Sequence, residues 1–190
     1  MKRIASAFVL CSFVLAASAA TAQAPVKGFR ADFLAQQDGV EKELLGLAEA
    51  TPADKFSWRP AEGVRSISEV YTHLAGANYM LMSFAGVKAP EGASASENAM
   101  EKTVTEKAAV IAEMKKSFAH LRAAVISIPD SDLGKPVTYF GRKGTIGGLI
   151  LLTANHEHEH LGQSIAYARM NGIVPPWSQP KAKPAENPAK

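Results

Sequence analysis

The sequence is poor in cysteine, with Cys11 as the single one among 190 residues. Cys11 lies inside a stretch that we predict, from the features below, to be removed from the mature protein. The mature chain would then hold no thiol. Disulfide scaffolds, thiolate metal sites and cysteine nucleophiles are therefore excluded, even in an oxidising compartment where disulfides persist.

An excess of charge of one sign is also lacking. The chain has 21 lysines and arginines against 18 aspartates and glutamates, and removal of Lys2 and Arg3 leaves 19 against 18. No basic stripe with interleaved aromatic residues is present, so we expect no nucleic-acid partner. After residue 24 the sequence has no apolar run long enough to cross a bilayer, so we expect no membrane contact after signal cleavage.

The N-terminus has the pattern of a secretory signal peptide. Two basic residues precede an apolar run from Ile4 to Ala17, and small residues follow it. Ala20-Thr21-Ala22 fits the small-x-small cleavage pattern, which predicts a signal peptide over residues 1–22 and a mature chain from Gln23. The protein would then be periplasmic or secreted. An uncleaved anchor is the alternative, and it would also place the rest of the chain outside the cytoplasm.

Four later segments show the three- and four-residue spacing of apolar residues that predicts helices. The first runs from about Phe29 to Ala48. The second begins after Ser66, which can form a capping box with Glu69. A third and longer helix follows the Pro/Gly/Ser-rich connection 89–96 and stops at Pro129. Its expected apolar positions are Ile111, Met114, Phe118, Leu121, Val125 and Ile128.

The fourth helix follows a short extended stretch between residues 135 and 143. Thr145 can cap its start, and Asn171-Gly172 is a usual helix end. The Pro-rich segment 175–190 is predicted to be disordered. The predicted fold class is therefore all-α, with one four-helix bundle domain over residues 23–174. A three-helix core with one peripheral helix is the main alternative.

Three histidines lie close together within the fourth helix. At about 100° per residue, His156 and His160 project from the same side one turn apart, whereas His158 points nearly opposite. The pair belongs to a seam with steps of three and four, formed by Leu149, Thr153, His156, His160, Gln163 and Tyr167. Burying an imidazole without a partner costs on the order of 1–3 kcal/mol. A shared divalent metal ion would account for the pair, and two core histidines bonded to neighbouring side chains are the alternative.

A third ligand is needed because two seldom hold a metal tightly. His73, at the margin of the apolar stripe of the second helix, is the candidate. His120 falls off the seam of the third helix and, like His158, is predicted to be solvated. Glu157 and Glu159 flank the histidine seam. Either could orient a ligand ring or move a proton, but we expect both to be solvated.

The same segment matches H-E-x-x-H, the helical zinc signature of metalloproteases, at His156, Glu157 and His160. Metzincins continue with a glycine and a third histidine, where this chain has Gln163 and Ala166. The only later glutamate lies in the Pro-rich tail. The pattern therefore supports a metal site more than it supports proteolysis.

Several motifs together resemble the DinB-like superfamily of four-helix-bundle metal proteins, over about residues 29–176. They are Phe56-Ser-Trp58-Arg-Pro60, Ser66-Ile67, Glu69-Val70-Tyr-Thr-His73-Leu74, His156-x-x-x-His160-Leu-Gly-Gln163, Tyr167-Ala-Arg169-x-Asn-Gly172 and Pro175-Pro176. The resemblance implies a divalent ion such as zinc, nickel, iron or manganese. It also implies that His73, His156 and His160 are the ligands.

The better-understood members of that superfamily are metal-dependent enzymes that activate a low-molecular-weight thiol, and many members have no established activity. An export signal departs from those cytoplasmic members and argues against thiol transfer. We therefore expect an exported metal-dependent transferase or hydrolase acting on a small molecule, with one coordination position left open.

Two rival functions remain at this stage: a metal-binding or stress-related protein without turnover, and a purely structural bundle. Histidine ligands suit several divalent metals, so the ligand type does not identify the metal. No general base is assigned. A small-molecule substrate and a homodimer are both compatible with the sequence.

Overall fold

The computed structural model describes residues 25–93 and 97–180, so the predicted signal peptide lies outside the described residues. The described chain is mainly helical. Its helices are α1 (Gly28–Ala50), α2 (Ile67–Phe84), α3 (Glu97–Thr103), α4 (Lys107–Ser127) and α5 (Ile146–Met170), with 3-10 helices η1 (Ala53–Lys55), η2 (Asp130–Asp132) and η3 (Pro176–Ser178) and strands β1 (Pro136–Tyr139) and β2 (Arg142–Thr145).

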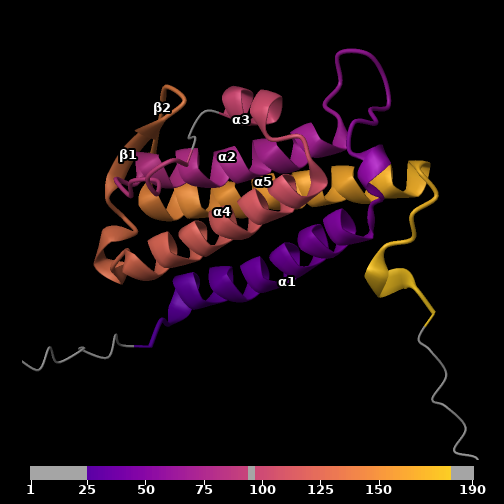
Figure 1. Cartoon of the computed structure of the whole chain (residues 1–190). Coiled ribbons are helices and arrows are strands. Elements are labelled where there is room, and N and C mark those ends of the chain that lie inside the picture. Colours follow the sequence, from indigo (N-terminus) through magenta and orange to yellow (C-terminus); the bar gives the residue numbers. More distant parts are fainter. Residues whose placement is uncertain (1–24, 94–96, 181–190) are drawn as a thin grey trace, which may run out of the picture.

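The four long helices α1, α2, α4 and α5 lie alongside one another as a bundle (Figure 1). Helices α1 and α2 each pack against both α4 and α5. All four contribute buried apolar side chains, so the bundle is observed and the three-helix alternative is wrong. Among the described helices, none combines the length and the apolar character needed to cross a bilayer.

The helix ends that we predicted from capping residues, at the start of α2 and at both ends of α5, are confirmed. The Ser66 side chain accepts from the Glu69 amide, and the Glu69 carboxylate accepts from the Ser66 amide, which completes the capping box of α2. The Thr145 side chain accepts from the Gly148 amide at the start of α5. Gly172, with φ of 72°, follows the end of α5, as expected for a residue without a Cβ.

The predicted third helix is divided into α3 and α4. Residues 104–106 separate the two, and two of them, Val104 and Thr105, are β-branched residues, which favour helix less than unbranched ones do. Met100 of α3 is buried against Ala75 and Tyr79 of α2, so α3 lies on the bundle instead of extending α4. In α4 the buried stripe starts at Val110, one residue before the position that the periodicity predicted.

The predicted single extended stretch before α5 is a β-hairpin. Strands β1 and β2 pair antiparallel, with Tyr139 opposite Arg142. Phe140 and Gly141 form the two-residue turn, and both have positive φ, 48° and 73°. The hairpin lies at one end of the bundle (Figure 1), where the Tyr139 ring approaches Phe84 of α2 at 6.5 Å between centroids.

The beginning of the predicted disordered tail is structured. Helix η3 packs against α1, with Pro176 close to Gly46. Pro175 and Pro176 restrict the backbone to conformations suited to the turn. Residues 181–190 of the tail lie outside the described part of the chain.

A buried polar layer divides the core. One apolar cluster contains Leu44, Leu74 and Phe118, and the other contains Leu81, Leu121 and Leu149. Near the boundary between these clusters lie Gln37, Asn78, Ser117 and Glu157, all buried. Gln37 donates to Glu157 at 3.1 Å, and Asn78 donates to Ser117 at 3.4 Å. The pairing matters because an unsatisfied buried polar group costs about 1–3 kcal/mol.

Candidate metal centre

The three predicted ligands come together although they lie on two helices. His73 projects from α2, and His156 and His160 project from successive turns of α5. Each offers one ligand atom, and these atoms all lie within 4.8 Å of one another. The Nε2 atom of His156 is 3.1 Å from Nε2 of His73 and 3.1 Å from Nε2 of His160.

The spacing of these nitrogens suits a single small cation. A tetrahedral ion at about 2.0–2.1 Å from each imidazole nitrogen holds neighbouring nitrogens roughly 3.3 Å apart. His73 and His160 are buried, with 8% and 7% of their surfaces exposed, and His156 is half-buried. The donor set is therefore chemically and geometrically able to hold a divalent ion, and imidazole suits several metals.

A chain of hydrogen bonds orients His160. Its Nδ1 lies 2.8 Å from the Gln163 side-chain oxygen, which can only accept. The Gln163 amide donates to the Tyr167 hydroxyl at 3.0 Å. Tyr167 in turn meets Trp58 edge-on, with 5.4 Å between ring centroids. The proton of His160 is thereby drawn to Nδ1, and the lone pair of Nε2 faces the other two histidines.

His73 has a carboxylate on its outer side. Its Nδ1 lies 3.3 Å from the Glu101 carboxylate, which also binds Arg65 at 3.0 Å. A carboxylate beside Nδ1 favours the tautomer that leaves Nε2 free for a metal. Sequence reasoning missed Glu101 because α3 is short and shows no periodic pattern, so only the folded chain brings it to His73.

Burial lowers the pKa of His160, and the neighbouring Gln163 partly opposes that effect. A lowered pKa keeps the ring neutral. Only a neutral imidazole can donate a lone pair to a metal ion, so this electrostatic setting favours ligation.

Glu157 is buried, and the prediction that it is solvated is wrong. Its surface is 1% exposed, and burial raises its pKa to about 8, an effect that the Gln37 hydrogen bond opposes and the Glu41 charge reinforces. The prediction assumed one inward seam on α5. The helix packs against α2 on one side and α1 on the other, so it has two buried faces.

The hydrogen bond to Gln37 of α1 keeps the Glu157 carboxyl in the polar layer. Among the described residues, Glu157 is not in the group that could hold a metal. The H-E-x-x-H pattern therefore lacks the arrangement that proteolysis needs, in which the glutamate works beside the ion. His158 and Glu159 are exposed, as predicted.

His120 is half-buried, and the prediction that it is solvated is also wrong. Its ring packs against Tyr79 of α2 at 5.2 Å between centroids, and burial lowers its pKa. Residues 90–93, which precede α3, line a surface depression together with Tyr79 and His120. The helix periodicity could not show that a loop approaches this face.

A cavity of about 260 Å³ opens beside the three histidines. Apart from His73 and His156, its lining is apolar and comes from α2, α5 and the hairpin turn: Ala77, Met80, Leu81, Phe140 and Leu152. A ligand in this cavity would touch two of the three imidazoles.

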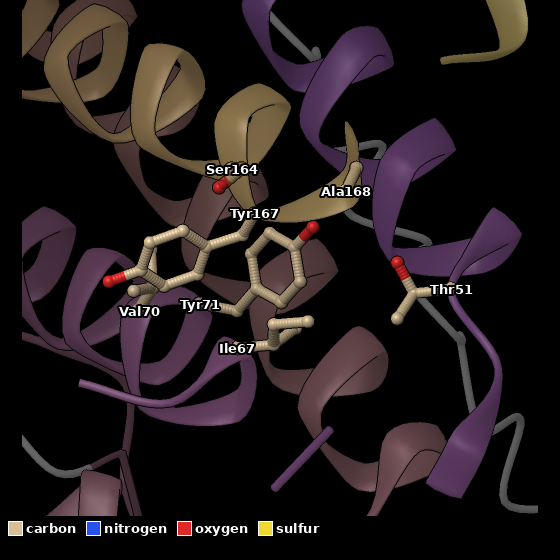
Figure 2. A pocket seen from close by; sticks show the side chains of 7 residues that line it. All are labelled: Thr51, Ile67, Val70, Tyr71, Ser164, Tyr167 and Ala168. Atoms are coloured by element: carbon tan, nitrogen blue, oxygen red, sulfur yellow. The ribbon is translucent and has the colours of Figure 1, made fainter. Parts of the chain in front are cut away.

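A second, tighter cavity lies near the other end of α5 and contains no imidazole or carboxylate (Figure 2). Figure 2 shows the hydroxyl of Tyr71 on the Thr51 side of this cavity and the hydroxyl of Tyr167 on the opposite side. Tyr71 is almost fully buried, and burial raises its pKa. The cavity offers hydroxyl groups and no usual metal donor, so it does not compete with the histidines as a metal site.

The fold and this site define a helical-bundle protein with a candidate three-histidine metal centre. The chain belongs to the DinB superfamily, whose family model matches residues 36–164. The bundle agrees with that assignment, and the predicted family is confirmed.

Similar proteins are found in Bacillus. The uncharacterized protein YjoA of Bacillus subtilis (strain 168) is 28% identical over 130 residues, which cover 66% of this chain and 80% of that protein. A DinB-like protein from Bacillus cereus ATCC 10987 has a solved structure with a TM-score of 0.67 and 19% identity, covering 76% of this chain and 93% of that one. The YjoA structure gives a TM-score of 0.52 and 24% identity, covering 81% and 99%. These structural likenesses support the fold.

Proposed function

We propose that this protein binds one divalent metal ion through His73, His156 and His160 and uses it to activate a small molecule. The observation that carries the proposal is the convergence of the three Nε2 atoms, with both neighbouring contacts at 3.1 Å. The alternative of two core histidines bonded to neighbours does not explain why a third imidazole from another helix joins them.

The outer partners of two rings strengthen this argument. Glu101 beside His73 and Gln163 beside His160 both favour a proton on Nδ1. Two Nε2 lone pairs then face His156, whose own Nε2 has at most one proton to share. A cation held by the three rings would accept a lone pair from each of them, which hydrogen bonding among the rings does not achieve.

A divalent ion held by His73, His156 and His160 would supply Lewis-acid chemistry, which polarises a carbonyl or lowers the pKa of a thiol or water. The residues of the chain would supply the rest. His73 and His156 line the cavity, and Met80 and Leu152 give it an apolar wall beside them. Transfer to, or hydrolysis of, a small substrate is the chemistry that this arrangement favours.

One observation favours the non-catalytic alternative, a metal-binding or stress-related protein. Among the described residues, none that lines the cavity is acidic or basic apart from the two histidine ligands. If the reaction needs a general base other than these histidines, the substrate itself would have to supply that base. Turnover is therefore the point that separates the two functions.

We further propose that the protein works outside the cytoplasm. The support is the N-terminal sequence, with two basic residues, an apolar run and the Ala20-Thr21-Ala22 cleavage pattern. An export assay with the native N-terminus, compared with a variant in which Ala20 and Ala22 are both replaced by glutamine, tests this. Retention of the wild-type protein in the cytoplasm would contradict export.

The function is tested with purified, tag-free protein loaded with Zn²⁺, Ni²⁺, Fe²⁺ or Mn²⁺. Turnover would be measured on panels of thiol-transfer, ester and amide substrates, with chelated protein as the control. Metal-dependent turnover that is lost in His156→Ala supports the enzyme. Stoichiometric metal binding without turnover on any panel favours the metal-binding protein.

A further inference from the structure

The turn of the β-hairpin contains a residue that is locally unfavourable there. Two-residue hairpin turns with positive φ at both positions prefer Asn-Gly or Gly-Gly, and this chain has Phe140-Gly141. A residue with a Cβ in the left-handed region costs about 1–2 kcal/mol. The side chain of Phe140 is 60% exposed, so core burial does not offset that cost.

The Phe140 ring nevertheless has an aromatic neighbour in α2. It meets the Phe84 ring edge-on at 5.3 Å between centroids, and it lines the cavity that also contains His73 and His156. An unfavourable backbone conformation that keeps an exposed aromatic ring beside candidate ligands points to a role in function.

We infer that this cavity receives the apolar part of a small metal-binding molecule, with Phe140 as one wall that selects for it. The inference rests on the proposed metal function and adds the chemical class of the ligand. That ligand has a single metal-binding head group and an uncharged tail, such as one aromatic ring or a short alkyl chain.

The lining of the cavity decides the nature of the tail. Ala77, Met80, Leu81 and Leu152 offer apolar contact, and within residues 25–93 and 97–180 no Asp, Glu, Lys or Arg side chain belongs to the lining. Burying an unpaired charge is costly, so a tail with a carboxylate or ammonium group is disfavoured. A polar, multiply charged thiol therefore fits this cavity poorly.

The size of the cavity limits the ligand. Its volume of about 260 Å³ lies just below the roughly 300–1,000 Å³ typical of pockets for drug-sized molecules. A tail of one ring fits this space. Burial of apolar surface is expected to tighten binding by about tenfold or more relative to the head group alone.

The test uses Co²⁺-loaded protein and three hydroxamates that share one head group. Acetohydroxamate has almost no tail, benzohydroxamate has an uncharged ring, and 4-carboxybenzohydroxamate has a charged one. Kd would be measured by titration, followed through the visible absorption of Co²⁺. Wild-type protein should bind benzohydroxamate at least about tenfold more tightly than acetohydroxamate, and the carboxylated probe should lose most of that gain.

Variants separate Phe140 from the metal centre. Phe140→Ala should bring the preference for benzohydroxamate down to about threefold or less while acetohydroxamate affinity stays the same. Phe140→Gly, which suits the turn backbone, should do likewise. Leu151→Ala is the matched control, because Leu151 is 53% exposed on α5 and does not line the cavity.

The outcomes distinguish this inference from the function on which it rests. If Co²⁺ is retained and acetohydroxamate binds, but the ring adds nothing or Phe140→Ala keeps the full preference, the ligand class is overturned and the metal function stands. Equal affinity for the charged and uncharged rings overturns it as well. Failure to retain Co²⁺ overturns both.

Discussion

Gln163 accepts a hydrogen bond from Nδ1 of His160 at 2.8 Å, one turn further along the same helix. This contact links the metal centre to the core, because the Gln163 amide donates to Tyr167, which packs on Trp58. Trp58 precedes α2, the helix that carries His73. The orientation of one ligand thus depends on packing between the start of one helix and the end of another.

Replacing Gln163 should weaken metal binding without unfolding the protein. Outer-sphere partners of histidine ligands typically contribute about 10–100-fold in metal affinity, so we expect a loss of that size for Gln163→Leu. Affinity would be measured by competition with a chromogenic chelator. Gln36→Leu, at an exposed position of α1, is the matched control. Unchanged affinity in Gln163→Leu would show that the hydrogen bond does not position His160.

Glu101→Gln tests the corresponding partner of His73. The substitution keeps the shape of the side chain but removes the charge that faces Nδ1 and binds Arg65. We expect lower metal affinity, again by about tenfold or more. The free energy of unfolding of the metal-free protein should change less than the metal affinity, because glutamine keeps the shape of the side chain and its oxygen can still accept from Arg65. A large loss of stability with unchanged affinity would assign Glu101 a structural role instead.

Glu157→Gln should stabilise the metal-free protein at high pH. Burial raises the pKa of Glu157 to about 8, whereas an unfolded chain has a glutamate pKa of about 4.3. The stability that Glu157 contributes is therefore complete below about pH 4 and is lost as pH rises towards 8. Glutamine does not titrate, so at pH 8 we expect the variant to gain on the order of 3 kcal/mol.

Urea unfolding at pH 4.5 and pH 8, with a chelator present, measures this effect. Glu159→Gln is the control, because Glu159 is exposed on the same helix. An equal change in the free energy of unfolding at both pH values would mean that Glu157 does not hold its proton in the folded state.

The hairpin turn gives a prediction on stability alone. At position 140, with φ of 48°, glycine should be more stable than alanine by about 1 kcal/mol, because only alanine has the strained Cβ. Thermal unfolding of Phe140→Gly and Phe140→Ala provides the comparison. The reverse order would argue that this backbone conformation is not kept in solution.

The apolar periodicity predicted α1, α2 and most of α4 and α5, because each long helix carries a stripe that must be buried. The same spacing placed His156 and His160 on one side of α5. His73 lies only at the margin of its stripe, so its role needed the family resemblance.

Other parts of the site depend on contacts between distant segments. Glu157 is buried because α1 covers a second face of α5, and Glu101 reaches His73 because α3 folds onto α2. The exposed Phe140 lines the cavity through the path of the hairpin. These contacts between distant segments could not be predicted from the sequence, because the apolar spacing along a helix indicates only one of its buried faces.

The metal content of tag-free purified protein tests the central claim most directly. Elemental analysis would compare the wild type with His73→Ala, His156→Ala, His160→Ala and the control His158→Ala, whose side chain is exposed. We predict one divalent ion per chain in the wild type and in His158→Ala, and loss of most of it in each of the other three. The same metal content in all of these proteins would contradict the three-histidine site.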